Sequence, residues 1–166
     1  MNGTFVPCEK CGAVNRVAGG ADGKSPVCGT CKAELSNYHD GVVELSGPAL
    51  NSLVKSSPIP VLVDFWAPWC GPCKSFAPVF KNVASSYAGR VVFGKLNTDD
   101  HQQVSQSLGI RGIPTLIAYS NGSEIGRQSG ALPENFFREL VDEVLKRAGE
   151  AAADCSTDVI PAKAGI

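Results

Sequence analysis

A nearly continuous apolar run that leads into two closely spaced cysteines constrains the fold of this chain more than any other feature. The run covers residues 60–66 (Pro-Val-Leu-Val-Asp-Phe-Trp), and Cys70 and Cys73 follow it. Such a run is typical of a strand buried on both faces, as in the middle of an α/β sheet. A helix is expected to start near Cys70, so the cysteine pair lies where a buried strand passes into a helix.

The segments around this run alternate between strand and helix patterns. Short strands are predicted near 42–45, 91–96, 115–119 and 124–129, and helices near 48–57, 70–87, 98–109 and from 133 onward. Thr98 is the expected cap of the third helix, and Asn121-Gly122 indicates a tight hairpin turn. The last helix is expected to bury Phe136 and Phe137. This order predicts an α/β fold with a central mixed sheet and helices on both faces.

Composition divides the 166 residues into three segments. Residues 1–40 hold two cysteine knuckles and little that is apolar, so something other than a core must stabilise them. Residues 41–149 form the α/β domain. Residues 150–166 are Ala-rich without a sustained period, and we interpret them as a disordered tail. Cys155 is alone in this tail, either as a free exposed thiol or as a partner in an intermolecular disulfide.

The pair Cys70 and Cys73 has the spacing and the context of a redox site. A helix N-terminus stabilises a thiolate at Cys70, so the pKa of this thiol is expected to fall below that of free cysteine. Only the thiolate attacks a disulfide. Cys73 lies one helical turn away and can attack the mixed disulfide that forms. The alternative, that the pair is half of a metal site, is disfavoured because four other cysteines already complete one.

The segment Trp66-Ala67-Pro68-Trp69-Cys70-Gly71-Pro72-Cys73-Lys74 resembles the active site of thioredoxins, and the strand and helix order of 41–149 is similar to their fold. The resemblance implies a protein-disulfide reductase with Cys70 as nucleophile and Cys73 as resolving thiol. It places Asp64 as a buried acid beneath the pair, with a raised pKa, and Lys95 beside that acid. The alternatives are a solvent-exposed Asp64 at the strand end and an ordinary solvated Lys95.

The same resemblance implies a substrate-binding surface around the cysteine pair. Ile113-Pro114 matches the loop that faces the active site in thioredoxins, where the proline is cis and the preceding backbone pairs with a bound chain. Without the resemblance, Pro114 would be a simple strand-entry proline, and Trp66 could equally be core. The residues expected to contact substrate are Trp69, Gly71, Pro72, Ile113, Pro114 and Gly130.

The two N-terminal knuckles, Cys8-x-x-Cys11 and Cys28-x-x-Cys31, are separated by 16 residues. This spacing is typical of a four-thiolate zinc site, and Gly12 and Gly29 suit the tight turns that it needs. Two disulfides or four free thiols are the alternatives. With these knuckles the chain resembles the zinc-carrying thioredoxins of bacteria, which implies a structural or regulatory Zn²⁺, no organic cofactor, and a possible release of zinc on thiol oxidation.

Charge and hydropathy exclude several classes of function. The net charge of −1 offers no basic face for nucleic acid and no polybasic handle for a membrane. No secretory signal is recognisable, so a cytoplasmic location is expected. The resemblance to thioredoxins implies disulfide-containing proteins as substrates and thioredoxin reductase as electron donor, and we expect a monomer. Two other hypotheses remain: an oxidant or isomerase with the same chemistry, and a binding module that uses the redox fold as a scaffold.

Overall fold

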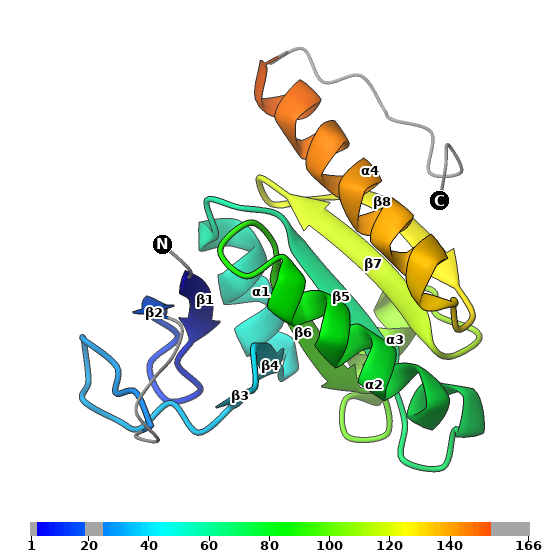
Figure 1. Ribbon diagram of the computed structural model, residues 1–166. Coiled ribbons are helices and arrows are strands. Elements are labelled where there is room, and N and C mark those ends of the chain that lie inside the picture. Colours follow the sequence, from blue (N-terminus) through cyan, green and yellow to red (C-terminus); the bar gives the residue numbers. More distant parts are fainter. Residues whose placement is uncertain (1–2, 19–24, 154–166) are drawn as a thin grey trace.

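The computed structural model describes residues 3–18 and 25–153 (Figure 1). Along the chain it contains β1 (Gly3–Pro7), β2 (Val14–Ala18), β3 (Tyr38–His39), β4 (Val42–Glu44), α1 (Gly47–Ser56), β5 (Val61–Trp66), α2 (Gly71–Ser86), β6 (Val92–Asn97), α3 (Gln102–Ser107), β7 (Thr115–Ser120), β8 (Ser123–Ser129) and α4 (Glu134–Ala153). None of the helices in these ranges combines the length and the hydropathy that a bilayer crossing requires.

Six strands of the described residues form the main sheet, in the order β3-β4-β6-β5-β7-β8. β5 lies inside it, parallel to β6 and antiparallel to β7. β7 and β8 form an antiparallel hairpin whose turn residues, Asn121 and Gly122, have φ angles of 52° and 83°. Both angles are positive, as a tight hairpin turn requires. The predicted α/β fold with a mixed sheet is confirmed.

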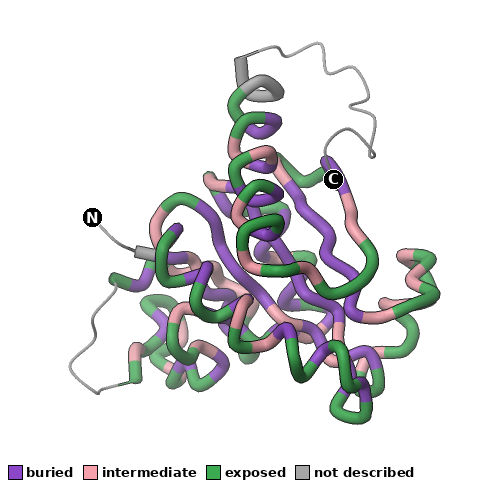
Figure 2. Tube along the Cα trace, turned by 45° about the vertical axis from the view of Figure 1, so that its right-hand side comes forward, coloured by how far each residue is buried: buried purple, intermediate pink, exposed green. Residues whose placement is uncertain are grey.

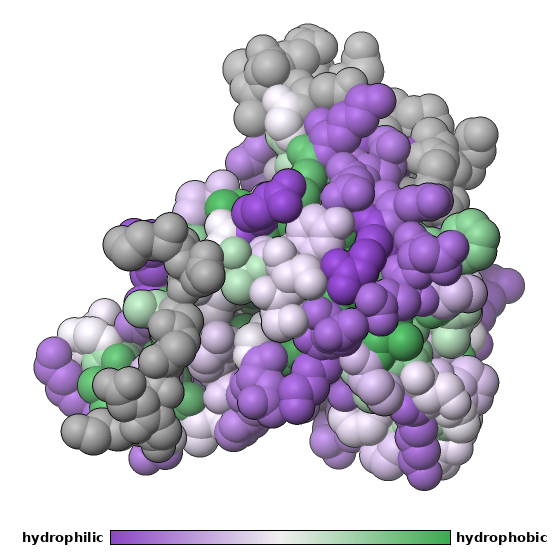
Figure 3. All heavy atoms as spheres, viewed as in Figure 1, coloured by the Kyte–Doolittle hydropathy of each residue, from purple (hydrophilic) through white to green (hydrophobic). Residues whose placement is uncertain are grey.

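Helices cover both faces of this sheet, with α2 and α4 on one side and α1 and α3 on the other (Figure 1). Alternate residues of β5 face opposite cores: Leu62 packs with Phe80 of α2 and Phe137 of α4, whereas Val63 packs with Leu53 of α1. Burial on both faces explains the continuous apolar sequence of β5, and Figure 2 shows the central strands as buried. On the face in Figure 3, hydrophobic residues are scattered among polar ones.

The N-terminal segment shares the core of the α/β domain, which the sequence did not indicate. β1 and β2 pair as an antiparallel hairpin and contact α1. Val6, Val17 and Leu35 are buried in the same cluster as Leu50 and Leu53 of α1. The few apolar residues of this segment therefore suffice because α1 supplies the other half of the core.

Polar contacts also join the two parts. The Asn37 side chain donates to the backbone oxygen of Pro7 at 3.0 Å and to that of Glu44, in β4, at 3.3 Å. The hydroxyl of Ser46, the N-cap of α1, donates to Glu9 Oε1 at 2.8 Å. Glu9 lies between Cys8 and Cys11, so the first knuckle is tied directly to the start of α1.

Three local expectations need correction. Thr98 does not cap α3, whose N-cap is His101; the Thr98 hydroxyl instead donates to the Trp66 carbonyl oxygen at 3.1 Å. Phe136 is 54% exposed, whereas its neighbour Phe137 is fully buried. Helix α4 continues to Ala153, beyond the expected start of a tail at 150. Cys155 lies outside the described residues.

Candidate redox site

The cysteine pair lies at the N-terminal end of α2, and a disulfide joins Cys70 to Cys73. Cys70 is the N-cap of the helix, and its Sγ accepts the backbone N–H of Cys73 at 3.2 Å. The sulfur of Cys70 thus lies where unpaired backbone donors and the helix dipole favour negative charge. Both residues are nearly buried and pack with Ala67, Trp66 and Ile113.

The loop before β7 faces this disulfide. The Ile113–Pro114 peptide bond is cis, as the resemblance implied. The carbonyl oxygen of Ile113 lies 3.7 Å from Cys70 Sγ. The backbone N–H of Gly130 donates to the Pro114 oxygen at 2.8 Å, so the loop is tied to the end of β8. The backbone of this loop therefore lies directly beside Cys70.

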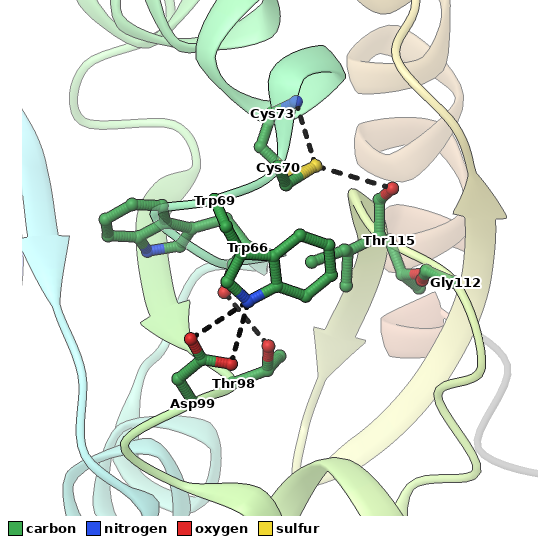
Figure 4. Close-up of a disulfide and its surroundings, with 9 residues drawn as sticks. Trp66, Trp69, Cys70, Cys73, Thr98, Asp99, Gly112 and Thr115 are labelled. Atoms are coloured by element: carbon green, nitrogen blue, oxygen red, sulfur yellow. Dashed lines mark hydrogen bonds between the residues drawn. A yellow bond between two sulfur atoms is a disulfide. The ribbon is translucent and has the colours of Figure 1, made fainter.

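Exposed residues surround the disulfide on the other side. Gly71 and Pro72, in the first turn of α2, are exposed. Trp69 is 69% exposed, and its indole Nε1–H donates to both carboxylate oxygens of Asp99, at 3.2 and 3.0 Å (Figure 4). Asp99 thereby holds an exposed aromatic ring beside the cysteine pair. The sequence does not indicate this contact, because no local pattern links residues 30 positions apart.

Asp64 is buried in β5, with 1% of its surface exposed. Neither carboxylate oxygen has a hydrogen-bond partner among the described residues. Burial raises the pKa of Asp64 to about 7, Lys95 opposes this rise, and Glu44 adds to it. The alternative of a solvent-exposed strand-end aspartate is wrong. A buried carboxyl group with such a pKa can take up or release a proton near neutral pH.

Lys95 lies next to Asp64 in the parallel register of β5 and β6. Its Nζ is 4.4 Å from the ring centroid of Trp66, a cation–π arrangement, and it lowers the pKa of Asp64 from a distance. Glu44 pairs with Lys95 on the adjacent strand β4. No local pattern in the sequence points to Glu44, because only the strand register brings it to the site.

A second cluster of thiols lies in the N-terminal segment. The sulfur atoms of Cys8, Cys11, Cys28 and Cys31 all lie within 4.8 Å of one another. The contacts between knuckles are 3.7 Å for Cys8 to Cys31 and 3.6 Å for Cys11 to Cys28. Tetrahedral zinc with Zn–S bonds of about 2.3 Å has sulfur atoms about 3.8 Å apart. The four residues, which are free thiols in the structure, therefore fit a metal ion of this kind.

The backbone of each knuckle is folded as such a site requires. Cys8 N–H donates to the Ala13 oxygen and Cys28 N–H to the Ala33 oxygen, both at 2.8 Å. The residue after the second cysteine has a positive φ in both knuckles: 81° at Gly12 and 66° at Lys32. The left-handed position of the second knuckle is therefore held by a lysine, and Gly29 is not the residue that turns the chain there.

The thiols of this cluster differ in acidity. The backbone N–H of Cys31 is the main cause that lowers the pKa of Cys28, to about 6, against the opposing effect of burial. The pKa of Cys8 is likewise lowered, first by the backbone N–H of Cys11. For Cys11 the backbone N–H of Ala13 acts in the same direction, but burial and the three neighbouring thiols raise its pKa to about 11. Backbone donors thus act on the sulfur atoms of Cys8, Cys11 and Cys28.

A redox-active cysteine pair at the start of a helix, packed against a cis-proline loop on a mixed sheet, defines a thiol–disulfide oxidoreductase. Comparison with known proteins narrows the class. The sequence profile of the thioredoxin family matches residues 41–143, and the chain belongs to this family. The match covers the α/β domain and does not extend to the cysteine knuckles.

Individual relatives agree with this assignment. The chain is 42% identical to thioredoxin of Haemophilus influenzae over 102 residues, which are 61% of this chain and 95% of the relative. It is 36% identical to thioredoxin C-3 of Corynebacterium nephridii over 143 residues, which are 86% of this chain and 97% of the relative. With the chloroplastic thioredoxin M5 of Oryza sativa subsp. japonica it shares 40% identity over 112 residues, 68% of this chain and 65% of the relative.

Proposed function

We propose that this chain reduces disulfides in other proteins, with Cys70 as the nucleophile and Cys73 as the resolving thiol. The observation that carries the proposal is the position of Cys70 Sγ at the N-cap of α2, where it accepts the N–H of Cys73. In the dithiol form the same position stabilises a thiolate. Cys73 lies behind it in the first turn and is 2% exposed, against 4% for Cys70.

The reaction proceeds in two exchange steps. The Cys70 thiolate attacks one sulfur of the substrate disulfide, a mixed disulfide forms, and the other substrate sulfur leaves as a thiolate that takes up a proton. Cys73 then loses its proton and attacks Cys70 Sγ, which releases the second substrate thiol and leaves the Cys70–Cys73 disulfide of this structure. Two electrons and two protons from an external reductase regenerate the dithiol.

Asp64 is the proposed base for the second step. It lies on the α2 side of the sheet, and its pKa of about 7 lets it accept the Cys73 proton at neutral pH, directly or through water. Lys95 is proposed to tune Asp64 through its charge. Its position over the Trp66 ring argues against direct contact with the reacting sulfurs.

Substrate docking is proposed to use the loop and the exposed rim around the disulfide. The Ile113 backbone, followed by cis-Pro114, offers hydrogen-bonding groups to an extended chain next to Cys70. Trp69 supplies an exposed apolar ring on the opposite side. Gly71, Pro72 and Gly130 add little side-chain bulk, so a folded substrate can come close.

The N-terminal segment, about residues 1–40, is proposed to be a zinc ribbon with Cys8, Cys11, Cys28 and Cys31 as ligands. The thioredoxin domain follows, from residue 41 to the end of α4 at Ala153. Bound zinc would supply a cross-link between the two knuckles. The sulfur separations support this assignment. We also propose a redox-sensing role, in which oxidation of the thiolates releases the metal.

The proposed setting is a cytoplasmic monomer that thioredoxin reductase keeps reduced. A measured reduction potential distinguishes this role from the oxidant or isomerase alternative, because a reductase must have a potential near or below that of the reducing pool of its compartment.

An insulin-reduction assay tests the mechanism. Cys70→Ser is expected to abolish turnover, and Cys73→Ser is expected to trap a mixed disulfide that mass spectrometry detects. Cys155→Ser is the matched control, since it removes a thiol outside both motifs, and it should leave the rate unchanged. Turnover that survives in Cys70→Ser would remove the mechanism, whereas a wild-type protein without turnover would favour a scaffold role.

A further inference from the structure

Asn15 joins the two cysteine knuckles through its side chain. It lies on β2, just beyond the first knuckle. Its Oδ1 accepts the backbone N–H of Gly29 at 2.9 Å, and its Nδ2 donates to the Ala13 oxygen at 3.1 Å. Gly29 directly follows Cys28, and the Ala13 oxygen also accepts the N–H of Cys8. One amide group therefore connects the backbone that positions Cys8 with the backbone that positions Cys28.

This connection does not depend on a bound metal. Among the described residues, thiol pairs at 3.7 and 3.6 Å also join the knuckles near the site. Each pair weakens when both of its thiols ionise, because like charges repel. The Asn15 amide is neutral, so its hydrogen bonds persist whatever the charge on the sulfurs.

The side chain at this position must both donate and accept. The acceptor Oδ1 serves Gly29 and the donor Nδ2 serves Ala13, and an amide carries both at the required spacing. Aspartate would lose the donor, alanine would lose both groups, and leucine would keep the volume without either. Asn15 is half-buried, so lost hydrogen bonds are only partly replaced by water.

We propose that Asn15 is the residue that preorganises the four-thiolate site, holding the two knuckles at ligand distance and so setting the affinity for the metal and the rate of its release. This inference rests on the proposed metal site at Cys8, Cys11, Cys28 and Cys31. Groups outside the ligand set that orient metal ligands typically contribute about 10- to 100-fold to affinity.

The test is a titration of the reduced full-length protein with Co²⁺, followed by thiolate-to-cobalt charge-transfer absorption, and then competition with Zn²⁺. Asn15→Ala and Asn15→Leu are both expected to weaken binding by about 10- to 100-fold and to speed metal loss to a chelator. Asn135→Ala, at an exposed position on α4, is the matched control and should bind as the wild type does.

The two Asn15 variants separate hydrogen bonding from packing, because leucine fills the space that alanine leaves. Equally weakened metal binding in both variants supports the proposed role of the Asn15 hydrogen bonds. Metal affinity that recovers in Asn15→Leu overturns it, as does wild-type affinity in either variant. Insulin reduction serves as a second readout: both variants should remain active, because the Cys70 site lies on α2. If the wild type itself gives no charge-transfer band, the proposed metal site is wrong, and so is the proposed role of Asn15. The proposed reductase function would be unaffected.

Discussion

Replacing Asp64 with asparagine should make the protein more stable, and increasingly so as pH rises from about 4 to about 7. The carboxyl group is buried, has no hydrogen-bond partner among the described residues, and has a pKa of about 7 against an ordinary value of 3.8. Between these values the unfolded chain releases the proton while the folded chain keeps it. The folded state then binds more protons, so the free energy of unfolding falls as pH rises through this window.

The size of the effect follows from the two pKa values. One pKa unit corresponds to about 1.4 kcal/mol, so the interval from 3.8 to about 7 is about 4 kcal/mol in all. Below pH 4 the carboxyl group is neutral in both states and the penalty is absent. Above pH 7 it is ionised in both states and the penalty is constant. The asparagine side chain would be neutral throughout, so the difference between variant and wild type should grow by about 4 kcal/mol across the window.

Urea denaturation of the oxidised proteins at several pH values between 4 and 8 measures this difference, with the fluorescence of Trp66 and Trp69 as the signal. Asp100→Asn is a suitable control, because Asp100 is exposed and its substitution should leave a pH profile parallel to that of the wild type. A difference between Asp64→Asn and wild type that stays constant from pH 4 to 8 would refute the reasoning, since it would mean that Asp64 ionises alike in the folded and unfolded chains.

Two further predictions concern stability. Because Val6 and Leu35 share a core with α1, the reduced protein should melt in one cooperative transition. Removing the metal with a chelator should lower the melting temperature by about 5–10 °C, relative to protein with free zinc at about 100 times its Kd. A ribbon that melts separately from the sheet in calorimetry would contradict that. In α4, Phe137→Ala should cost about 3–5 kcal/mol in chemical denaturation, whereas Phe136→Ala should stay within about 0.5 kcal/mol; similar costs would contradict the assigned burial.

The fold was predictable from the sequence where a short stretch of residues determines the local structure by itself. Continuous apolar residues gave β5, and Asn121-Gly122 gave the β7–β8 turn, because each depends on local chemistry. The adjacent pair Phe136 and Phe137 was not resolved, since both fit a broad helical stripe and only the packing of α4 decides between them. The expected helix-capping role of Thr98 was wrong, because its hydroxyl donates a hydrogen bond to the carbonyl oxygen of Trp66.

Part of the candidate site was also predictable from the sequence. Cys70 and Cys73 stand in one short motif, and a family resemblance supplied Asp64 and Pro114. Contacts made by register or by distant chain segments carry no local signal. The hydrogen bond from Trp69 to Asp99, the strand pairing that brings Glu44 to Lys95, and the docking of the knuckles on α1 all arise this way.

The central claim is that the Cys70 sulfur is ionised at the N-terminus of α2 while Cys73 waits in the turn behind it. Alkylation of the reduced protein with iodoacetamide across a pH series, with mass spectrometry to locate the label, measures this directly. Cys70 should be labelled before Cys73, with a rate midpoint clearly below the value of about 8.5 for an ordinary thiol. A midpoint at that value, or preferential labelling of Cys73, would contradict it.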